Sequence, residues 1–354
     1  MARIELDHIR HAYMANPQSA DDYALKEVHH QWSDGGAYAL LGPSGCGKTT
    51  LLNIISGLLK PSEGQIRFNG TDVTNLSTEE RNIAQVFQFP VVYDTMTVFD
   101  NLAFPLRNRG LPEADVKKRV TETLEMLDLS DRANKRARGL TADQKQKISL
   151  GRGLVRRDVN AILFDEPLTV IDPHLKWVLR SELKKLHRRF GFTMVYVTHD
   201  QTEALTFADK VVVMYEGEIV QIGTPDELFR KPAHTFVGYF IGSPGMNIVP
   251  IKLDQGRARL GEHVIDMPGA TPMPGKMELG IRPEFVTLGR EGMPVSISKV
   301  EDIGRHRIVR AQLADHDIAV VVPEDGDIPA DPRVTFVPEG INLYADSRRV
   351  ETRG

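Results

Sequence analysis

In the N-terminal part of the chain, the spacing of apolar residues changes from that of strands to that of a helix. Ala2–Ile9 alternates in part, as a half-buried strand does, and Ala37–Leu41 is a short apolar run that ends at Gly42. Over Thr49–Gly57 the apolar residues return every three or four positions, as on one face of a helix. We therefore expect strand, turn and helix in immediate succession.

Residues 94–157 show the spacing of amphipathic helices. One predicted helix opens at Pro112, and a second begins near Thr141 and continues to Val155. The first has four apolar side chains on one face: Val116, Val120, Leu124 and Leu127. This pattern predicts a helical subdomain over about residues 90–157.

Strand patterns return behind this helical segment. Ala161–Phe164 and Thr193–Val197 are compact apolar strands, and a helical pattern over about 175–190 separates them. Strands that alternate with helices indicate a parallel sheet with helical crossovers.

The pattern changes again after about residue 235. Residues 241–354 are rich in Gly and Pro and carry short alternating runs, which are typical of a separate all-β barrel or sandwich. Three such runs are Met277–Ile281, Val295–Val300 and Ala319–Val322. A chain of 354 residues is long enough for two domains, which we place at 1–235 and 236–354.

Composition narrows the class of protein without naming an activity. A net charge of -4 gives no overall attraction to phosphate backbones, so nucleic acid is not an expected partner. No uncharged apolar run approaches the roughly 18 residues that cross a bilayer, and the N-terminus lacks the pattern of a secretory signal. The single cysteine, Cys46, excludes an intramolecular disulfide and fits a reducing compartment.

A phosphate-loop motif, Gly-x-x-x-x-Gly-Lys-Ser/Thr, occurs at Gly42–Thr49, between a predicted strand and a predicted helix. Gly45 and Gly47 permit backbone angles that turn successive N–H groups inward, and a helix N-terminus adds partial positive charge. Lys48 would reach the β- and γ-phosphates, and the Thr49 hydroxyl would bind Mg²⁺. The predicted nucleotide-binding residues here are Gly42, Pro43, Ser44, Gly45, Cys46, Gly47, Lys48, Thr49 and Thr50.

Two acids and a histidine end the apolar strands of the predicted sheet. Asp165 and Glu166 follow Ala161–Phe164, and because side chains alternate along a strand they can serve different targets. Asp165 would complete the magnesium shell, and Glu166 would polarise the attacking water as general base. The alternative is a pair of solvated acids that caps the next helix. His199, behind the second strand, could hold the water in line.

In this order the motifs resemble those of the ATP-binding subunits of ABC transporters, especially of carbohydrate importers, over nearly the whole chain. By resemblance, Gly42–Thr49 is Walker A, and Asp165 with Glu166 is Walker B with its catalytic glutamate. Gln88 is the Q-loop residue, which would contact Mg²⁺ and sense the membrane partner. Two further matches are Asp172, in the D-loop segment Thr169-Val170-Ile171-Asp172, and the switch histidine His199.

The resemblance also covers the adenine contact and the C-terminal part. Tyr13 lies where the family places an aromatic ring that stacks on adenine; Tyr23 is the alternative, and core packing would explain either ring. Phe240–Pro244 and Gly280–Glu284 resemble the junctions of an OB-like regulatory domain. The expected fold is an α/β P-loop ATPase domain with a parallel or mixed sheet and a helical subdomain, followed by a C-terminal all-β OB-like domain.

One motif departs from the family. The signature Leu-Ser-Gly-Gly-Gln, which completes the partner's ATP site across a head-to-tail dimer, is replaced here by Leu140, Thr141, Ala142, Asp143 and Gln144. Asp143 would bring a carboxylate towards the partner's γ-phosphate, at a cost on the order of a few kcal/mol. A small backbone shift or a bridging cation would remove the conflict. We expect instead an asymmetric heterodimer with a second, different ATP-binding subunit.

The resemblance implies Mg²⁺-dependent ATP hydrolysis that drives an importer from the cytoplasmic face of the inner membrane. Its partners would be two membrane-spanning permease subunits, contacted through Phe89–Asp94, and indirectly a substrate-binding protein. The expected substrate is a carbohydrate or polyol, and the altered signature in this frame most resembles the paired ATPases of glycerol-type importers.

Three other functions compete with transport. A soluble ABC-type ATPase of DNA repair or translation would carry a coiled-coil insertion or tandem cassettes. A P-loop kinase or GTPase leaves His199 and Asp172 unexplained, and a scaffold that only binds nucleotide leaves Glu166 unexplained.

Overall fold

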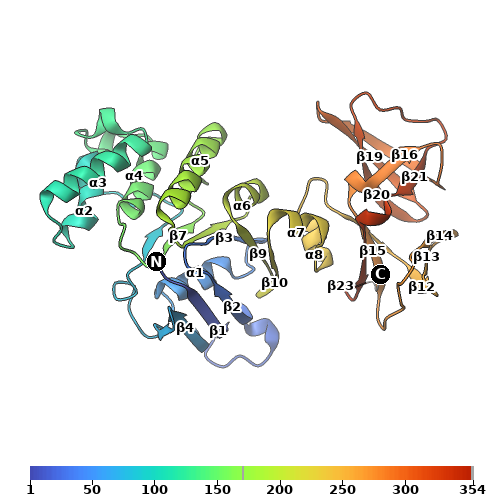
Figure 1. The fold of residues 1–354 in the computed structure, drawn as a ribbon, viewed down its shortest axis with the longest axis horizontal. Coiled ribbons are helices and arrows are strands. Elements are labelled where there is room, and N and C mark those ends of the chain that lie inside the picture. Colours follow the sequence, from blue (N-terminus) through green and yellow to red (C-terminus); the bar gives the residue numbers. More distant parts are fainter. Residues whose placement is uncertain (170, 352–354) are drawn as a thin grey trace. The chain divides into compact units, whose positions relative to one another are not determined.

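The computed structural model describes residues 1–169 and 171–351, and the chain divides into two compact units, Met1–Ile222 and Gly223–Gly354 (Figure 1). This division falls before the boundary at residues 235 and 236 that we placed from the sequence. The intervening residues include one short helix, Pro225–Arg230, that belongs to the second unit.

The first unit opens with an antiparallel sheet of order β2-β1-β4-β5. Its strands are β1 (Ile4–His11), β2 (Leu25–Trp32), β4 (Glu63–Phe68) and β5 (Thr71–Asp72), and a 3-10 turn at Ala20–Asp22 lies between β1 and β2. Ile4, Leu6 and Ile9 are fully buried in a cluster that also contains Trp32. The partial alternation of Ala2–Ile9 thus forms the buried face of β1.

A second sheet, of order β10-β9-β3-β8-β7-β6, forms the centre of this unit. Its strands are β3 (Ala37–Leu41), β6 (Ala84–Val86), β7 (Ile162–Asp165), β8 (Met194–Thr198), β9 (Lys210–Tyr215) and β10 (Glu218–Gly223). β3 pairs in parallel with β8 and β9, and β7 pairs in parallel with β6 and β8. All residues of β3 and β8 are buried, as expected for parallel strands covered on both faces.

Two groups of helices accompany this sheet. Around it lie α1 (Lys48–Ser56), α5 (Pro173–Phe190) and α6 (Gln201–Phe207). The predicted helical subdomain contains α2 (Val98–Arg107), α3 (Glu113–Met126) and α4 (Ala142–Leu154), with 3-10 turns at Ser130–Arg132 and Ala137–Gly139 (Figure 1). α2, which we did not distinguish from the sequence, packs on both α3 and α4. Val116, Val120 and Leu124 are buried, as the spacing predicted.

The second unit begins with α7 (Pro225–Arg230) and α8 (Thr235–Phe240) and continues as β structure. Its strands are β11 (Asn247–Pro250), β12 (Lys252–Asp254), β13 (Arg257–Leu260), β14 (His263–Asp266), β15 (Met277–Ile281), β16 (Val286–Gly289), β17 (Met293–Pro294), β18 (Ser296–Asp302), β19 (His306–Leu313), β20 (His316–Pro323), β21 (Arg333–Phe336), β22 (Ile341–Ala345) and β23 (Arg348–Val350). Short 3-10 turns lie at Pro283–Phe285 and Pro338–Gly340. Within the described residues, the strands of this unit form four small antiparallel sheets around one apolar core, in agreement with the predicted all-β domain.

Arg282 anchors α7 and α8 to the β structure of this unit. Its side chain is 1% exposed and donates hydrogen bonds to four backbone carbonyls, those of Leu228, Phe229, Gly238 and Ile241. Burial lowers the pKa of Arg282 to about 10. The junction motif Gly280–Glu284 therefore has a structural role, because its arginine satisfies the carbonyl ends of two helices.

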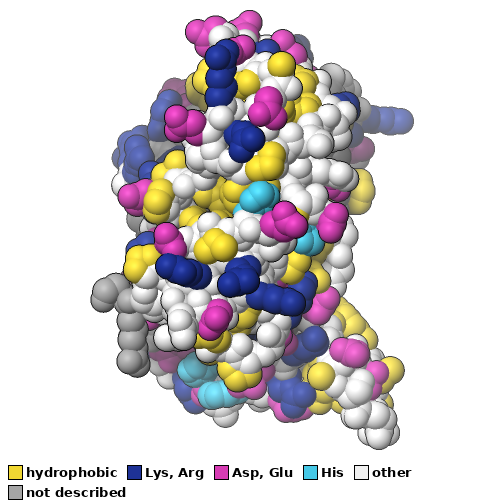
Figure 2. Space-filling view, turned by 90° about the vertical axis from the view of Figure 1, so that its right-hand side faces the viewer, with side chains coloured by type: hydrophobic (Ala, Val, Ile, Leu, Met, Phe, Trp, Pro, Cys, Tyr) yellow, Lys and Arg dark blue, Asp and Glu magenta, His cyan; other side chains and the backbone are white. Residues whose placement is uncertain are grey.

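On the molecular face drawn in Figure 2, acidic and basic side chains are interspersed, as expected from the small net charge.

Over the described ranges 1–169 and 171–351, every helix is too short or too polar to span a bilayer.

Candidate functional site

Four parallel strands bring the predicted site residues to one edge of the central sheet. These strands are neighbours in the order β6-β7-β8-β3. The segments that follow their carboxyl ends in the sequence therefore lie side by side. Gln88 follows β6, Asp165 ends β7, His199 follows β8, and Gly42–Thr49 follows β3. Motifs that lie far apart in the sequence are therefore gathered at one place.

The phosphate loop has the backbone angles that its glycines predict. Gly45 and Gly47 have φ values of 82° and 97°, in the left-handed region that favours glycine. A Cβ at Gly47 would also lie 2.6 Å from the carbonyl oxygen of Ala24, so this position needs glycine for packing as well. Helix α1 begins directly behind the loop, and its free N–H groups make the loop suitable for an anion.

Lys48 and Thr49 lie inside this loop. The Nζ of Lys48, which is buried, donates hydrogen bonds of 2.8 Å each to the carbonyl oxygens of Gly42 and Pro43. The Thr49 hydroxyl donates to Oδ1 of Asp165 at 3.3 Å. The loop and the end of β7 are thus in direct contact.

Cys46, in the same loop, is buried. Burial raises the pKa of its thiol, and the nearby Lys48 ammonium opposes this effect in part. A buried, protonated thiol is a poor nucleophile, which supports a packing role for Cys46.

Asp165 has an electrostatic environment that suits a cation. Burial raises the pKa of its carboxyl group, the neighbouring Glu166 charge acts in the same direction, and the Thr49 hydrogen bond opposes both. Two adjacent carboxylates at a buried strand end repel each other, so a bound cation would relieve them.

Glu166 and His199 meet across β7 and β8. His199 Nδ1 lies 3.2 Å from Glu166 Oε2, and the Thr169 hydroxyl donates to the same oxygen at 3.3 Å. Glu166 has φ of 44°, an unusual value for a residue other than glycine. The strand end and the histidine together fix the direction of this carboxylate.

The segment at Gln88 is tied to the Glu166 segment by a residue that sequence reasoning missed. Gln146 of α4 is fully buried, and its Nε2 donates to the carbonyl oxygens of Phe87, at 3.2 Å, and Pro167, at 2.7 Å. A polar residue on the buried stripe of this helix was the available signal. Gln146 therefore couples α4 to the segments on either side of the proposed water site.

Glu203, also missed, supports the His199 segment. Its Oε2 accepts hydrogen bonds from the Tyr196 hydroxyl at 3.0 Å and the Thr198 hydroxyl at 2.9 Å, and its side chain is buried. Asp200 caps the N-terminus of α6 through Thr202 N and Glu203 N. The buried acid was recognisable only with the strand and helix in place.

The two adenine candidates have different surroundings. Tyr13 is 70% exposed, packs edge-on against His11, and its hydroxyl lies 3.0 Å from Thr50 Oγ1. The Tyr23 ring is covered by the Arg10 guanidinium at 4.0 Å. An exposed ring beside the phosphate loop suits stacking on a base, which favours Tyr13.

The altered signature forms the N-terminus of α4. Thr141 is the N-cap; its N–H donates to Gln144 Oε1 at 3.2 Å and its hydroxyl donates to the Asp143 carboxylate. Ala142 is the first helical residue and is exposed. Asp143 thus places negative charge on a helix end that would otherwise attract anions.

The predicted D-loop lies between β7 and α5. Val170 of this segment lies outside the described residues, and Asp172 directly precedes α5.

Comparison with known proteins identifies the family. The model for ABC transporters matches residues 25–169. The sn-glycerol-3-phosphate import ATP-binding protein UgpC of Bordetella avium is 38% identical over 326 residues, which cover 90% of this chain and 88% of that protein. The chain belongs to the ATP-binding subunits of ABC transporters. The trehalose import ATP-binding protein SugC of Mycobacterium tuberculosis is 42% identical over 293 residues, which cover 81% of this ABC subunit and 73% of SugC.

Two solved structures support the fold of the ABC subunit. The cbiO1 protein of Clostridium perfringens, part of the transporter complex cbiONQ, aligns with a TM-score of 0.58 and 27% identity over 64% of this chain and 90% of that chain. The ATP-binding cassette MJ0796, solved as a dimer in a post-hydrolysis state with ADP and Pi, aligns with a TM-score of 0.56 and 29% identity over 62% of this chain and 98% of that chain.

These findings confirm the predicted family, fold class and enzymatic class. The subunit has an α/β P-loop ATPase domain and a C-terminal all-β OB-like domain, and it is an ATP-hydrolysing import subunit of the carbohydrate group. The names of these relatives mention no second, different ATP-binding subunit, so the heterodimer remains a prediction.

Proposed function

We propose that this ABC subunit hydrolyses ATP with Mg²⁺ at the edge of its central sheet, and that Glu166 is the base for the attacking water. The observation that carries this proposal is the Glu166–His199 pair beside the phosphate loop. A solvated pair of acids that only caps a helix would not require a histidine from the next strand. The assay of Glu166→Gln described at the end of the Discussion tests it.

The residues around Thr49 fit a magnesium ion. A hydroxyl oxygen and a carboxylate oxygen lie 3.3 Å apart at Thr49 and Asp165, and Mg²⁺ prefers oxygen ligands and keeps several waters. Gln88 would add an amide oxygen from the neighbouring segment. The ion, when bound, offsets the negative charge of the phosphates. Lys48 and the loop N–H groups bind and orient those phosphates.

The protein's part in hydrolysis is to hold a water molecule and take its proton. The Glu166 carboxylate accepts the proton from the water, which is general-base catalysis. His199, whose Nδ1 lies 3.2 Å from Glu166 Oε2, keeps the carboxylate in place and would face the γ-phosphate. Asp172 would face the partner subunit across the dimer, as the D-loop match implies.

The substrate that this subunit helps to import is proposed to be a polyol or sugar. The names of the relatives given above, sn-glycerol-3-phosphate and trehalose import proteins, support this class. Within it we predict glycerol, because the altered signature resembles that of glycerol-type importers. The test is ATP hydrolysis by the complex reconstituted with permeases and binding protein. Stimulation by glycerol supports the prediction, while stimulation by sn-glycerol-3-phosphate or trehalose alone contradicts it.

The proposed contact with the membrane subunits is the segment that follows Gln88 in the sequence. Phe89, Val91 and Tyr93 are large, exposed apolar side chains, with 69% of the Phe89 residue accessible. Such a cluster favours burial against another protein. We therefore place the subunit on the cytoplasmic face of the inner membrane, bound to two permease subunits. Recovery with polytopic membrane proteins is expected; recovery with ribosomes or DNA would instead support a soluble ABC-type ATPase.

We further propose an asymmetric dimer with a second, different ATP-binding subunit. The site at Gly42–Thr49 would be completed by the partner's signature, and the partner's own site would face Thr141–Gln144. The negative charge of Asp143 at the start of α4, near the place where that partner's γ-phosphate would lie, supports this arrangement.

Asp143→Gly tests this asymmetry without touching the Gly42–Thr49 site. The substitution is expected to raise ATP turnover of the complex, because it restores a small residue and removes the charge. Asp131→Gly, which removes an exposed acid elsewhere in the same subdomain, is the control. Unchanged turnover in Asp143→Gly would make the charge irrelevant, and vigorous cooperative hydrolysis by the purified subunit alone would contradict the heterodimer.

A further inference from the structure

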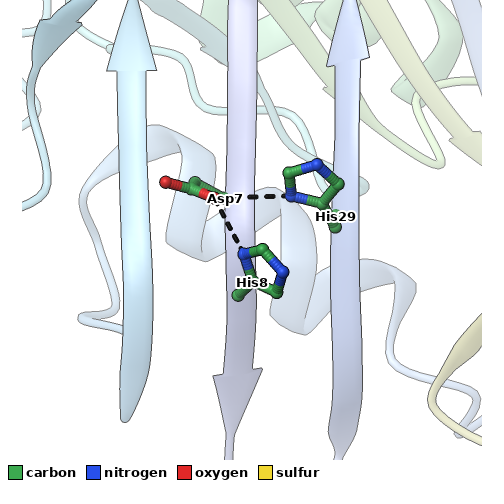
Figure 3. Close-up of side chains that lie close together, drawn as sticks. All are labelled: Asp7, His8 and His29. Atoms are coloured by element: carbon green, nitrogen blue, oxygen red, sulfur yellow. Dashed lines mark hydrogen bonds and ion pairs between the residues drawn. The ribbon is translucent and has the colours of Figure 1, made fainter.

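Three side chains with metal-binding atoms meet on the exposed face of the antiparallel sheet. Asp7 and His8 belong to β1, and His29 belongs to the neighbouring strand β2 (Figure 3). His8 Nδ1 lies 2.8 Å from Asp7 Oδ1, and His29 Nδ1 lies 3.4 Å from the same oxygen. One oxygen atom thus faces two imidazole nitrogens.

A β-bulge brings the first two of these residues to the same face. The pairing of β1 with β2 shifts between Leu6, opposite His30, and Ile9, opposite Val28. Asp7 and His8 therefore lie opposite the single residue His29. In a regular strand, consecutive side chains point to opposite faces, and His8 would point into the core.

The spacing of buried residues explains the bulge. Ile4 and Leu6 are buried two positions apart, whereas the next buried residue, Ile9, follows three positions later. An extra residue is needed to return Ile9 to the core face. His8 takes this extra position with φ of 51°, in the left-handed region that few residues other than glycine adopt.

The bulge is also held by β4, the strand that pairs with β1 on the side away from β2. A Cβ at Gly64 of β4 would lie 2.3 Å from the carbonyl oxygen of His8 and 2.6 Å from that of Asp7. Glycine allows β4 to pack closely against the bulged backbone. The backbone under Asp7 and His8 is therefore fixed independently of the side-chain cluster.

We propose that Asp7, His8 and His29 bind a divalent transition-metal ion such as Zn²⁺. Ligand atoms of a tetrahedral zinc site, at about 2.0–2.2 Å from the ion, lie about 3.3–3.6 Å from one another. The distance of 3.4 Å from Asp7 Oδ1 to His29 Nδ1 matches this edge, the distance of 2.8 Å to His8 Nδ1 is shorter, and the three ligand atoms all lie within 4.8 Å of one another. Small rotations of two exposed imidazole rings complete the arrangement, and water occupies the remaining position.

Residues around the cluster resemble the outer shell of a metal site. His8 Nε2, the nitrogen that would remain free of the ion, lies 3.7 Å from Glu27 Oε1. Arg67 Nη1 lies 3.2 Å from Asp7 Oδ2 and leaves Oδ1 to face the imidazoles. Carboxylates that hold the second nitrogen of a ligating histidine, and donors that hold a ligating carboxylate, are typical second-shell partners.

The ligand set distinguishes this ion from the one proposed at the nucleotide site. Imidazole nitrogens suit Zn²⁺, Ni²⁺ and Cu²⁺, whereas Mg²⁺ prefers an all-oxygen shell such as that of Thr49 and Asp165. Because its ligands come from two paired strands, a bound ion cross-links β1 to β2. It would stabilise the folded state by binding to it preferentially.

The experiment is a calorimetric Zn²⁺ titration of the full, tag-free chain after removal of metals, without nucleotide. One ion per chain is expected. His29→Ala and His8→Asn are each expected to weaken binding at least about tenfold; asparagine is chosen because it tolerates the left-handed backbone of residue 8. His30→Ala, which removes the next imidazole on β2 from outside the cluster, is expected to bind as the unchanged chain does.

A second measurement separates loss of binding from loss of folding. Zn²⁺ is expected to raise the thermal unfolding temperature of the unchanged chain and of His30→Ala, but not that of His29→Ala. The proposal is overturned if the unchanged chain binds no Zn²⁺. It is equally overturned if His29→Ala and His8→Asn, folded in the absence of metal, bind Zn²⁺ as tightly as the unchanged chain.

Discussion

His199 Nδ1 lies 3.2 Å from Glu166 Oε2, although the two residues follow different strands of the central sheet. The parallel pairing of β7 with β8 sets Asp165 opposite Val197, so the residues just beyond them become neighbours. Glu166 has φ of 44°, which turns its side chain out of the strand direction. The closeness of the proposed base to its proposed positioning histidine therefore follows from the register of the sheet.

Gly47→Ala is expected to destabilise the first unit more than Gly45→Ala. Both glycines have positive φ, so both substitutions strain the backbone. A Cβ at Gly47 would lie 2.6 Å from the Ala24 carbonyl oxygen, whereas one at Gly45 has no neighbour within 4 Å. Because of this overpacking, the free energy of unfolding of Gly47→Ala should be about 1–3 kcal/mol lower than that of Gly45→Ala, as measured by chemical denaturation. Equal losses of stability in the two variants would show that the backbone at Ala24 moves to accept the added Cβ.

Tyr13→Ala is expected to weaken ATP binding by about 2- to 12-fold, which corresponds to the roughly 0.5–1.5 kcal/mol of an aromatic stacking contact. Tyr13→Phe keeps the ring and loses only the hydroxyl contact with Thr50, so it should bind ATP nearly as the unchanged subunit does. Fluorescence titration with a labelled nucleotide measures both. Tyr23→Ala is the control, and a loss of affinity in Tyr13→Phe equal to that in Tyr13→Ala would exclude stacking as the main role.

Arg282→Met is expected to destabilise the second unit by at least about 3 kcal/mol. The guanidinium satisfies four carbonyl oxygens, and each buried acceptor left without a donor costs about 1–3 kcal/mol. Arg290→Met, which removes an exposed arginine of the same unit, should change stability by less than about 0.5 kcal/mol. Urea unfolding followed by circular dichroism compares them, since both tryptophans lie in the first unit. Equal stability of the two variants would disprove the anchoring role of Arg282.

Asp165→Asn is expected to raise the thermal stability of the nucleotide-free subunit at neutral pH. Burial raises the pKa of this carboxyl group above its ordinary value of 3.8, so ionisation costs folding free energy once the pH exceeds that range. The gain is fully present above the raised pKa of the folded state and disappears as the pH falls below 3.8, where the carboxyl is protonated in both the folded and the unfolded state. Calorimetry at a series of pH values checks this; a gain that does not depend on pH would point to packing.

Much of the site was predictable because its motifs report local chemistry. The glycines of the loop, the apolar strand before Asp165 and the helix behind Lys48 are read from spacing alone. The all-β character of the second unit followed in the same way from its short alternating runs.

What the sequence did not predict depends on distant contacts. Gln146 joins the segments on either side of the proposed water site through backbone carbonyls, and a single polar residue in a helix does not reveal its partners. The role of Arg282 likewise depends on where two helices end. The bulge at Asp7 and His8 was hidden because partial alternation in Ala2–Ile9 resembles a regular strand until the register is known.

The most direct test of the account is ATP hydrolysis by the assembled complex that contains Glu166→Gln in this subunit. Loss of the base should lower turnover by about 10²–10⁴-fold, while binding of ATP with Mg²⁺ is retained because the loop, Thr49 and Asp165 are unchanged. Gln201→Glu is the control: it exchanges the same two side-chain types at the start of α6 and so alters the charge near His199 without removing the proposed base. Its turnover is expected to stay close to that of the unchanged complex. Turnover undiminished by Glu166→Gln would contradict the assignment of the base and, with it, the proposed mechanism.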